Sequence, residues 1–160
     1  MVVVSKAKAP SFDVTRKVRD GCLCLHLQRA ARVVARRYDE ALRPVSLTNG
    51  QFSLLIALNR PEPATMGAVA ILLAMDRTTL TANLKPLERR RLLRVTVDPA
   101  DRRGRRLELT AAGRDLLLRA FPLWERTHGE LERTVVAADR LRGDLLALGQ
   151  KTTARLVGAP

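Results

Sequence analysis

The sequence predicts a mainly α-helical fold that carries one small two-stranded β-hairpin. Its 160 residues are 46% hydrophobic but only 3% aromatic, so the core must be aliphatic. Such a composition favours helices over an all-β sandwich. Apolar residues recur at helical spacing through most of the chain, and in one short region they alternate with polar residues, as in strands. The length suits a single domain of ordinary size.

The first predicted helix runs from about residue 14 to residue 42 and ends before Pro44. Residues 1–12 precede it without periodicity and are expected to form a flexible basic tail. Thr48 is expected to cap a second helix. The apolar stripe of the first helix consists of Leu23, Leu27, Ala30, Val34, Tyr38 and Ala41. The inward face of the second helix is predicted to hold Phe52, Leu55 and Ile56.

Two short helices with a brief joint follow. Thr65 can cap a helix from residue 66 to about 73, and Asp76 can cap another from residue 77 to about 90. This pairing is typical of a helix-turn-helix. Pro86 is expected to bend the second helix, which leaves Arg77–Lys85 as its working segment. The buried face of that helix is predicted to hold Leu80, Leu84 and Leu87.

The periodicity then changes from 3.6 to 2. Residues 93–97 and 107–109 alternate as two strands, and a long basic loop, residues 98–104, joins them. Thr110 is expected to cap a long helix, and a last helix begins near Asp139. Two helices, a helix-turn-helix, a two-stranded hairpin and further helices form a winged helix-turn-helix, in which the hairpin is the wing.

The charge balance points to a polyanionic partner. The formal net charge is +13, and ten basic residues against three acidic ones lie between Arg77 and Arg106. An excess of this size attracts nucleic acid first and an anionic membrane surface second. The longest apolar run has eight residues, too short to span a membrane, and the first residues do not resemble a signal peptide. We therefore expect a cytoplasmic protein with double-stranded DNA as its partner.

The predicted DNA contacts come from two elements. The segment Arg77–Lys85 is expected to enter the major groove, where Thr and Asn side chains can bind base edges or phosphates. The hairpin tip is expected to reach the minor groove, with Asp101 holding a neighbouring arginine through a carboxylate–guanidinium pair. The candidate contacts are Arg77, Thr78, Thr79, Thr81, Asn83, Lys85, Asp101, Arg102, Arg103 and Arg105.

Helices outside the DNA-binding region carry more apolar residues than one small core needs. We therefore expect residues 13–45 and 111–160 to form a dimerisation region that pairs with a second copy of the chain. Residues 46–110 would form the winged helix-turn-helix domain.

Several motifs resemble the MarR family of transcriptional regulators. They are Thr48-x-x-Gln51-Phe52-x-Leu54-Leu55, Asp76-Arg77-Thr78-Thr79-Leu80, Leu87-Glu88, Asp98-Pro99-x-Asp101-Arg102-Arg103 and Leu107-x-Leu109-Thr110-x-x-Gly113. The resemblance implies a homodimer on a pseudo-palindromic operator, usually a repressor that small phenolic or aromatic ligands or oxidants release. Arg91 departs from the family, which often has glycine at this position to end the recognition helix.

The two cysteines leave three interpretations open. Cys22 and Cys24 can be structural thiols, a redox sensor or, with His26, part of a metal site. By resemblance, Cys24 falls where the peroxide-sensing branch of the family has its reactive cysteine, but Gln28 stands where that branch has a tyrosine. If both cysteines lie on one helix, they point about 200° apart and cannot form a disulfide with each other.

These features favour a sequence-specific repressor released by a small aromatic ligand or by thiol oxidation. The ligand is expected in a crevice between the first helices and the DNA-binding lobe. The alternative is an architectural protein that coats DNA without specificity. The sequence offers no catalytic triad, phosphate loop or metal cluster, so we expect neither an enzyme nor a cofactor. His128, among charged neighbours, is expected at the surface.

Overall fold

The computed structural model describes residues 10–156, with side chains up to residue 149. The chain divides into two units, of which one ends at Arg36 and the other begins at Arg37. Most of the predicted basic tail, residues 1–9, lies outside the described residues. The helix after it begins at Phe12.

The first unit contains α1 (Phe12–Gly21) and most of α2 (Leu23–Leu42). The sequence predicted one continuous helix here, which is wrong, because Cys22 between them is extended, with φ −80° and ψ 107°. Gly21 explains the break, since glycine is among the residues that least favour a helix. No residue of α1 is buried.

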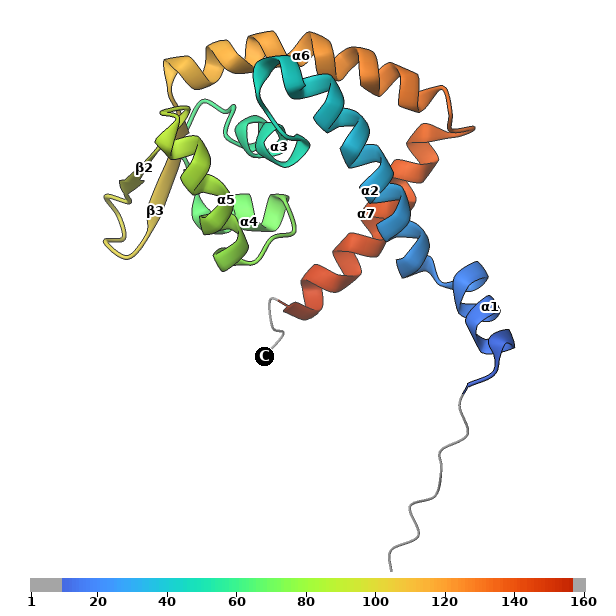
Figure 1. Ribbon diagram of the computed structural model, residues 1–160. Helices are drawn as coiled ribbons and strands as arrows, with labels where there is room; N and C mark the ends of the chain where they lie inside the picture. Colours follow the sequence, from blue (N-terminus) through green and yellow to red (C-terminus); the bar gives the residue numbers. More distant parts are fainter. Residues whose placement is uncertain (1–9, 157–160) are drawn as a thin grey trace, which may run out of the picture. The chain divides into compact units, whose positions relative to one another are not determined.

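The second unit carries the remaining elements in an order close to the predicted one (Figure 1). After α2 and a short 3-10 helix, Arg43–Val45, come α3 (Asn49–Ala57), β1 (Ala64–Thr65), α4 (Met66–Leu72), α5 (Arg77–Arg89), β2 (Leu93–Val97), β3 (Arg105–Leu109), α6 (Ala111–Glu132) and α7 (Ala138–Leu156).

Side-chain caps begin four of these helices, as the sequence predicted. The hydroxyl oxygens of Thr48, Thr65 and Thr110 each accept a hydrogen bond from a backbone N–H three residues later, and the Asp76 carboxylate does the same. At α3 the side chain of Gln51 completes a capping box by accepting from the Thr48 N–H. These caps fix where each helix starts.

The sheet has three antiparallel strands in the order β1–β3–β2, not the two that were predicted. In the hairpin Leu93 pairs with Leu109 and Val97 with Arg105. The extra strand is only two residues long, and its Ala64 pairs with Leu107. Two residues cannot display an alternating pattern, so the sequence offered no signal for β1. It anchors the start of α4 to the hairpin.

The core is aliphatic and lies between the helices and the sheet. The predicted inward face of α5 is confirmed, since Leu80, Leu84 and Leu87 are all buried. On α3 the prediction was wrong for Ile56, which is 43% exposed, while Leu54 is buried instead. The largest fully buried side chains are Leu42, Leu54, Leu55, Leu80, Leu87, Leu93, Leu107 and Val69.

Two non-glycine residues adopt left-handed backbone angles where α4 and α5 end. Ala74 (φ 50°) follows α4 and Arg91 (φ 56°) follows α5. In both turns the next residue donates its N–H back into the helix, from Met75 to the Ala70 carbonyl and from Leu92 to the Leu87 carbonyl. Arg91 therefore adopts the conformation that glycine provides at lower cost, and α5 ends as sharply as it would with glycine.

Candidate nucleic-acid interface

Helix α5 presents a polar outer face to solvent. Arg77, Thr78, Thr81 and Lys85 are exposed, as expected from the burial of the leucines on the opposite face. The helix continues beyond Pro86 to Arg89, so its regular part is longer than the predicted working segment.

Hydrogen bonds within α5 distinguish between its candidate base-reading groups. The Thr79 hydroxyl donates to Asp76 Oδ2 at 2.6 Å, and the Thr81 hydroxyl donates to the Arg77 carbonyl at 2.7 Å. The bonds from the Thr79 side chain and backbone lower the pKa of Asp76, so this cap stays ionised. Among the described residues the Thr78 side chain has no hydrogen-bond partner. Asn83 has only a long contact, 3.9 Å, to the Met75 sulfur.

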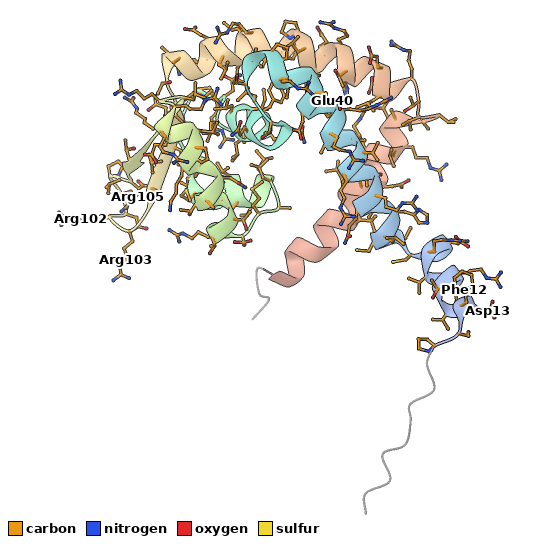
Figure 2. The ribbon with its side chains drawn as sticks, viewed as in Figure 1. Phe12, Asp13, Glu40, Arg102, Arg103 and Arg105 are labelled. Atoms are coloured by element: carbon orange, nitrogen blue, oxygen red, sulfur yellow. The ribbon has the colours of Figure 1, made fainter. Side chains whose placement is uncertain are left out.

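The loop between β2 and β3 is a tight polar turn with an arginine tip. Figure 2 shows Arg102 and Arg103 projecting outwards from it. Asp101 Oδ1 accepts from the Arg103 backbone N–H at 2.9 Å, and the Gly104 N–H donates to the Asp101 carbonyl at 2.8 Å. Asp101 therefore orders the turn through the backbone. The predicted pairing of its carboxylate with a neighbouring guanidinium is wrong for the described structure, in which Asp101 has no ion pair and its carboxylate accepts from a peptide N–H instead.

The hairpin carries two ion pairs that the sequence analysis did not predict, an exposed one between Arg94 and Glu108 and a more buried one between Asp98 and Arg106. Asp98 is the only buried charged residue among those described, at 7% exposure. Its Oδ2 lies 2.7 Å from Arg106 Nε, and its Oδ1 accepts from the Ala100 N–H at 3.0 Å. The hydrogen bonds from Ala100 and then Arg106 lower the pKa of Asp98. Because Asp98 directly follows the last residue of β2 and Arg106 lies in β3, the strand register could have suggested this pair.

Arg106 also joins the hairpin to the segment before β1, since its Nη1 lies 3.3 Å from the Pro63 carbonyl oxygen. Arg105, one residue earlier, behaves differently. Its Nη1 donates to the carbonyls of Arg102 and Gly104, at 3.2 and 2.9 Å. Both carbonyls are neutral, so the charge of Arg105 is not compensated by an acid there.

A second site lies among α3, α4 and α6. It is a pocket of about 600 Å³ whose wall includes the aromatic rings of Phe52, Phe121 and Trp124. Its polar residues gather near the end of α3 and include Asn59 and Arg60. In the described part of the chain, no ion-pair or hydrogen-bond partner holds the Arg60 guanidinium. The pocket therefore combines flat apolar walls with one uncompensated cation.

His128, which the sequence predicted at the surface, is partly exposed, with 34% of its side chain accessible, and it also packs against the aromatic wall. Its ring stacks on Trp124 at a centroid distance of 4.5 Å. Its Nδ1 lies 3.3 Å from the Tyr38 hydroxyl, and its Nε2 lies 3.4 Å from Glu132 Oε1. The same Glu132 oxygen accepts from Arg142 of α7 at 2.6 Å. Trp124, His128 and Glu132 are spaced by four on α6, so their proximity could have been predicted, but Tyr38 is 90 residues away from His128 and no sequence signal predicts that contact.

The cysteines lie in the first unit. Cys24 is exposed on α2, and Cys22 is half-buried in the break before it. The Gln28 side-chain N–H donates to Cys24 Sγ at 3.3 Å. Since Cys22 is not helical, the argument that a helix separates the two thiols no longer applies. Within the described residues, no group of three or more His, Cys, Asp or Glu side chains could hold a metal ion.

None of the described helices is long and apolar enough to cross a bilayer. The interface features above are those of a winged helix, and comparison with known proteins agrees with them. The family model of the MarR family matches residues 45–104. Over 113 residues the chain is 34% identical to the HTH-type transcriptional repressor NicR of Pseudomonas putida. The aligned region covers 69% of this chain and 67% of NicR. The chain belongs to the MarR family.

Solved structures share the MarR-family fold. The regulator MosR of M. tuberculosis, crystallised in complex with DNA, is 43% identical with a TM-score of 0.77, covering 83% of this chain and 97% of MosR. BpsR of Bordetella bronchiseptica, whose DNA binding is regulated by 6-hydroxynicotinic acid, is 27% identical with a TM-score of 0.68. The match covers 83% of this chain and 94% of BpsR. This MarR-family protein is therefore a DNA-binding transcriptional regulator with a winged helix-turn-helix.

Proposed function

We propose that this MarR-family protein is a homodimeric, sequence-specific repressor whose DNA binding a small aromatic ligand or thiol oxidation weakens. The observation that carries the proposal is the exposed polar face of α5 beside an arginine-tipped wing. NicR is named a repressor, and MosR was crystallised with DNA. Residues 46–110 would bind the operator, and residues 13–45 and 111–160 would form the dimer.

Exposed apolar side chains support the dimer. Helix α1 exposes Phe12 and Val18, α6 exposes Leu118, and α7 exposes Leu141 and Leu145. Large apolar side chains spread over several helices are typical of a surface that a second protein covers. A second copy is the partner that also suits a pseudo-palindromic operator, because two-fold symmetry in the protein matches two-fold symmetry in the DNA.

Within the monomer, the proposed division of labour follows the hydrogen bonds. Thr78, whose side chain has no hydrogen-bond partner among the described residues, and Asn83, which makes only the long contact to the Met75 sulfur, would read base edges in the major groove. Thr79 and Thr81, whose hydroxyl protons are engaged, would contribute mainly shape and methyl contacts. Arg102 and Arg103 would enter the minor groove, with Asp101 ordering the turn between them and the strands. Arg77, Lys85 and Arg105 would add positive charge.

The proposed ligand is a flat aromatic carboxylate or phenol in the pocket among α3, α4 and α6. Phe52, Phe121 and Trp124 offer rings for stacking, and the Arg60 guanidinium offers a bidentate partner for a carboxylate. The pocket includes Leu72 and Leu73 at the end of α4, the first helix of the helix-turn-helix. A bound ligand would therefore contact the helix-turn-helix directly. BpsR, regulated by an aromatic acid, offers a precedent.

Thiol oxidation is the alternative signal. Cys24 is exposed, and its sulfur accepts from Gln28 rather than from a tyrosine. A peroxide titration of DNA binding tests it with Cys24→Ser and Cys22→Ser as separate variants. If peroxide weakens DNA binding by the parent protein but not by one of the two variants, the substituted cysteine is the sensor. Equal binding before and after peroxide in the parent protein means that these cysteines are structural.

The competing function is non-specific coating of DNA, which the net charge alone would permit. The two are distinguished by comparing the affinity for a duplex selected from a random pool with the affinity for a scrambled duplex of equal length. A specific regulator is expected to prefer its operator by roughly 10³ or more at physiological salt. A ratio near one would replace the repressor with the coating protein, and a chain that stays monomeric in light scattering would reject the dimer.

A further inference from the structure

The pocket among α3, α4 and α6 is joined to the wing by a short segment of chain, residues 59–63, the strap. It follows α3 and leads into β1. At its first end the N–H groups of Asn59 and Arg60 donate to the carbonyls of Ile56 and Leu58, at 3.0 and 2.9 Å. Asn59 and Arg60 also line the pocket. The strap therefore begins in the pocket wall.

The far end of the strap is attached to the wing. The Pro63 carbonyl accepts from Arg106 Nη1 at 3.3 Å, and the next residue, Ala64, pairs with Leu107 of β3. The same Arg106 guanidinium donates from its Nε to Asp98 Oδ2 at 2.7 Å. One side chain therefore connects the strap with the buried acid at the base of the wing.

Asp98 extends this connection into the turn that carries the tip arginines (Figure 2). Its backbone N–H donates to the Gly104 carbonyl at 3.1 Å, and its own carbonyl accepts from the Asp101 N–H at 3.2 Å. Its Oδ1 accepts from the Ala100 N–H at 3.0 Å. Because Asp98 is bonded to the turn through three of its atoms, a change in its position moves the turn.

The sequence makes the strap stiff. The rings of Pro61 and Pro63 fix their own φ at about −65°. Each proline also restricts the residue before it, Arg60 or Glu62, to extended conformations. Four of the five residues of the strap are therefore restricted. A segment of this kind transmits a displacement from one end to the other instead of absorbing it.

The bond between the strap and Arg106 is the longest in this series. At 3.3 Å it lies just beyond the usual range for an N–H···O bond, and a further lengthening of about 0.3 Å would end it. The contact between Arg106 and Asp98 is short, 2.7 Å, and charge-assisted, so it is stronger. The strap can therefore leave Arg106 while Arg106 stays on Asp98.

We infer that Arg106 is the positioning residue through which an anion in the pocket controls the wing, with the strap as the connection. A carboxylate that pairs with Arg60 draws the strap towards the pocket and favours the arrangement in which the Pro63 carbonyl has left Arg106. A ligand shifts such an equilibrium only by binding one arrangement better, and the pairing with Arg60 supplies that difference. The base of the wing then loses one support, and the contacts of the tip arginines with DNA weaken.

This role depends on the proposed binding of ligand and DNA, and it deepens that proposal by naming the wing, rather than α4, as the element on which the ligand acts. The test measures affinity for a selected duplex with and without saturating salicylate, and the ratio of the two affinities is the readout. In the parent protein the ratio is expected to be about 5- to 150-fold, the usual range for coupled sites. A purely structural role of Arg106 would lower both affinities and leave their ratio unchanged.

Arg106→Lys should lower the ratio by about 2- to 10-fold, the contribution of one hydrogen bond. A lysine ammonium paired with Asp98 lacks the second nitrogen that contacts Pro63. The matched control is Arg94→Lys. Arg94 also forms an ion pair across the hairpin, with Glu108 at 2.8 Å, but none of its hydrogen bonds in the described structure reaches the strap. This control should keep the ratio of the parent.

A second variant loosens the strap without changing the wing. Pro61→Gly,Pro63→Gly keeps the carbonyl at position 63 but removes the restriction on the backbone. The ratio should fall here too, while salicylate still binds, as Trp124 fluorescence reports. Melting curves establish that each variant is folded before its ratio is compared with that of the parent.

Removal of the tip arginines separates the wing from α4 as the target of the ligand. In Arg102→Ala,Arg103→Ala the ratio should approach one, because salicylate has no tip contacts left to weaken. A ratio equal to that of the parent in this protein, an unchanged ratio in folded Arg106→Lys, or equal falls in Arg106→Lys and Arg94→Lys would overturn the inference and leave the proposed ligand intact. A parent protein whose DNA binding salicylate does not change overturns the inference together with the proposed ligand.

Discussion

Asp98 and Arg106 face each other across the base of the wing, with Arg106 Nε 2.7 Å from Asp98 Oδ2. The pair connects the end of β2 with β3, and Arg106 extends the connection to the Pro63 carbonyl. The buried Asp98 carboxylate therefore holds the base of the wing in place. The position of the arginines at the wing tip depends on this base.

Asp98→Asn is expected to lower the melting temperature and to weaken DNA binding, because the Arg106 guanidinium loses its anionic partner. Hydrogen bonds lower the pKa of Asp98 in the folded state, so ionisation of this group favours folding. Its contribution is complete above the unfolded-state pKa, about 3.9, and is lost as pH falls through the lower native value. Melting curves from pH 7 to pH 2 should therefore converge for parent and variant only at the acid end.

The control for this series is Asp115→Asn, an exposed acid of α6 without an ion pair in the described structure. Its melting temperature should follow that of the parent at every pH. If Asp98→Asn behaved in the same way, the pair would not hold the wing.

Gly113→Ala is expected to destabilise the fold by about 1–3 kcal/mol, the usual cost of overpacking. A Cβ at Gly113 would lie 2.0 Å from the Leu92 carbonyl oxygen, which already accepts from the Thr110 N–H. Only glycine lets α6 start this close to β2. Chemical denaturation measures the loss, and Gly129→Ala is the control, because its Cβ would meet nothing closer than 3.9 Å. That variant should be neutral or more stable.

Arg91→Gly is expected to stabilise the protein by up to about 1 kcal/mol, because glycine adopts a left-handed backbone without the steric cost that arginine bears. The measurement is the midpoint of urea unfolding. Arg89→Gly, within the last turn of α5, should instead destabilise by about 1 kcal/mol. Equal effects of the two substitutions would mean that the strain at residue 91 has no energetic consequence.

Trp124, the only tryptophan of the chain, lines the pocket and should report its occupancy directly. Addition of an aromatic carboxylate such as salicylate is expected to change its fluorescence with saturation. Arg60→Ala should weaken that binding by about tenfold or more, because one hydrogen bond to a charged group contributes about 1.5 kcal/mol or more, and Arg60→Lys should retain part of it. Identical affinities in all three proteins would exclude Arg60 as the carboxylate partner.

Local signals predicted much of the fold. The caps at Thr48, Thr65, Asp76 and Thr110 were predictable because each depends on residues three apart. The hairpin followed from its alternation. The break at Cys22 and strand β1 were missed, because a glycine before a helical pattern and a two-residue strand are both weak signals.

Groups that depend on distant contacts could not be predicted. Tyr38 of α2 contacts His128 and stacks on Trp124, both of α6, and no spacing in the sequence predicts these contacts. The role of Asp101 was misassigned for a different reason, which is local. An Asp beside two arginines suggests an ion pair, whereas the turn makes its carboxylate accept from the backbone N–H of Arg103. Turn geometry decided between two partners that lie equally near in sequence.

The most direct test of the central claim is selection of bound duplexes from a random pool by the purified full-length protein. The account predicts enrichment of a pseudo-palindrome whose half-sites lie about one helical turn apart, one for each α5. Thr78→Ala and Asn83→Ala should change the enriched bases within the half-sites more than they change overall affinity. A pool that stays random, or a single unpaired half-site bound by one chain, would contradict a dimer that reads DNA through two recognition helices.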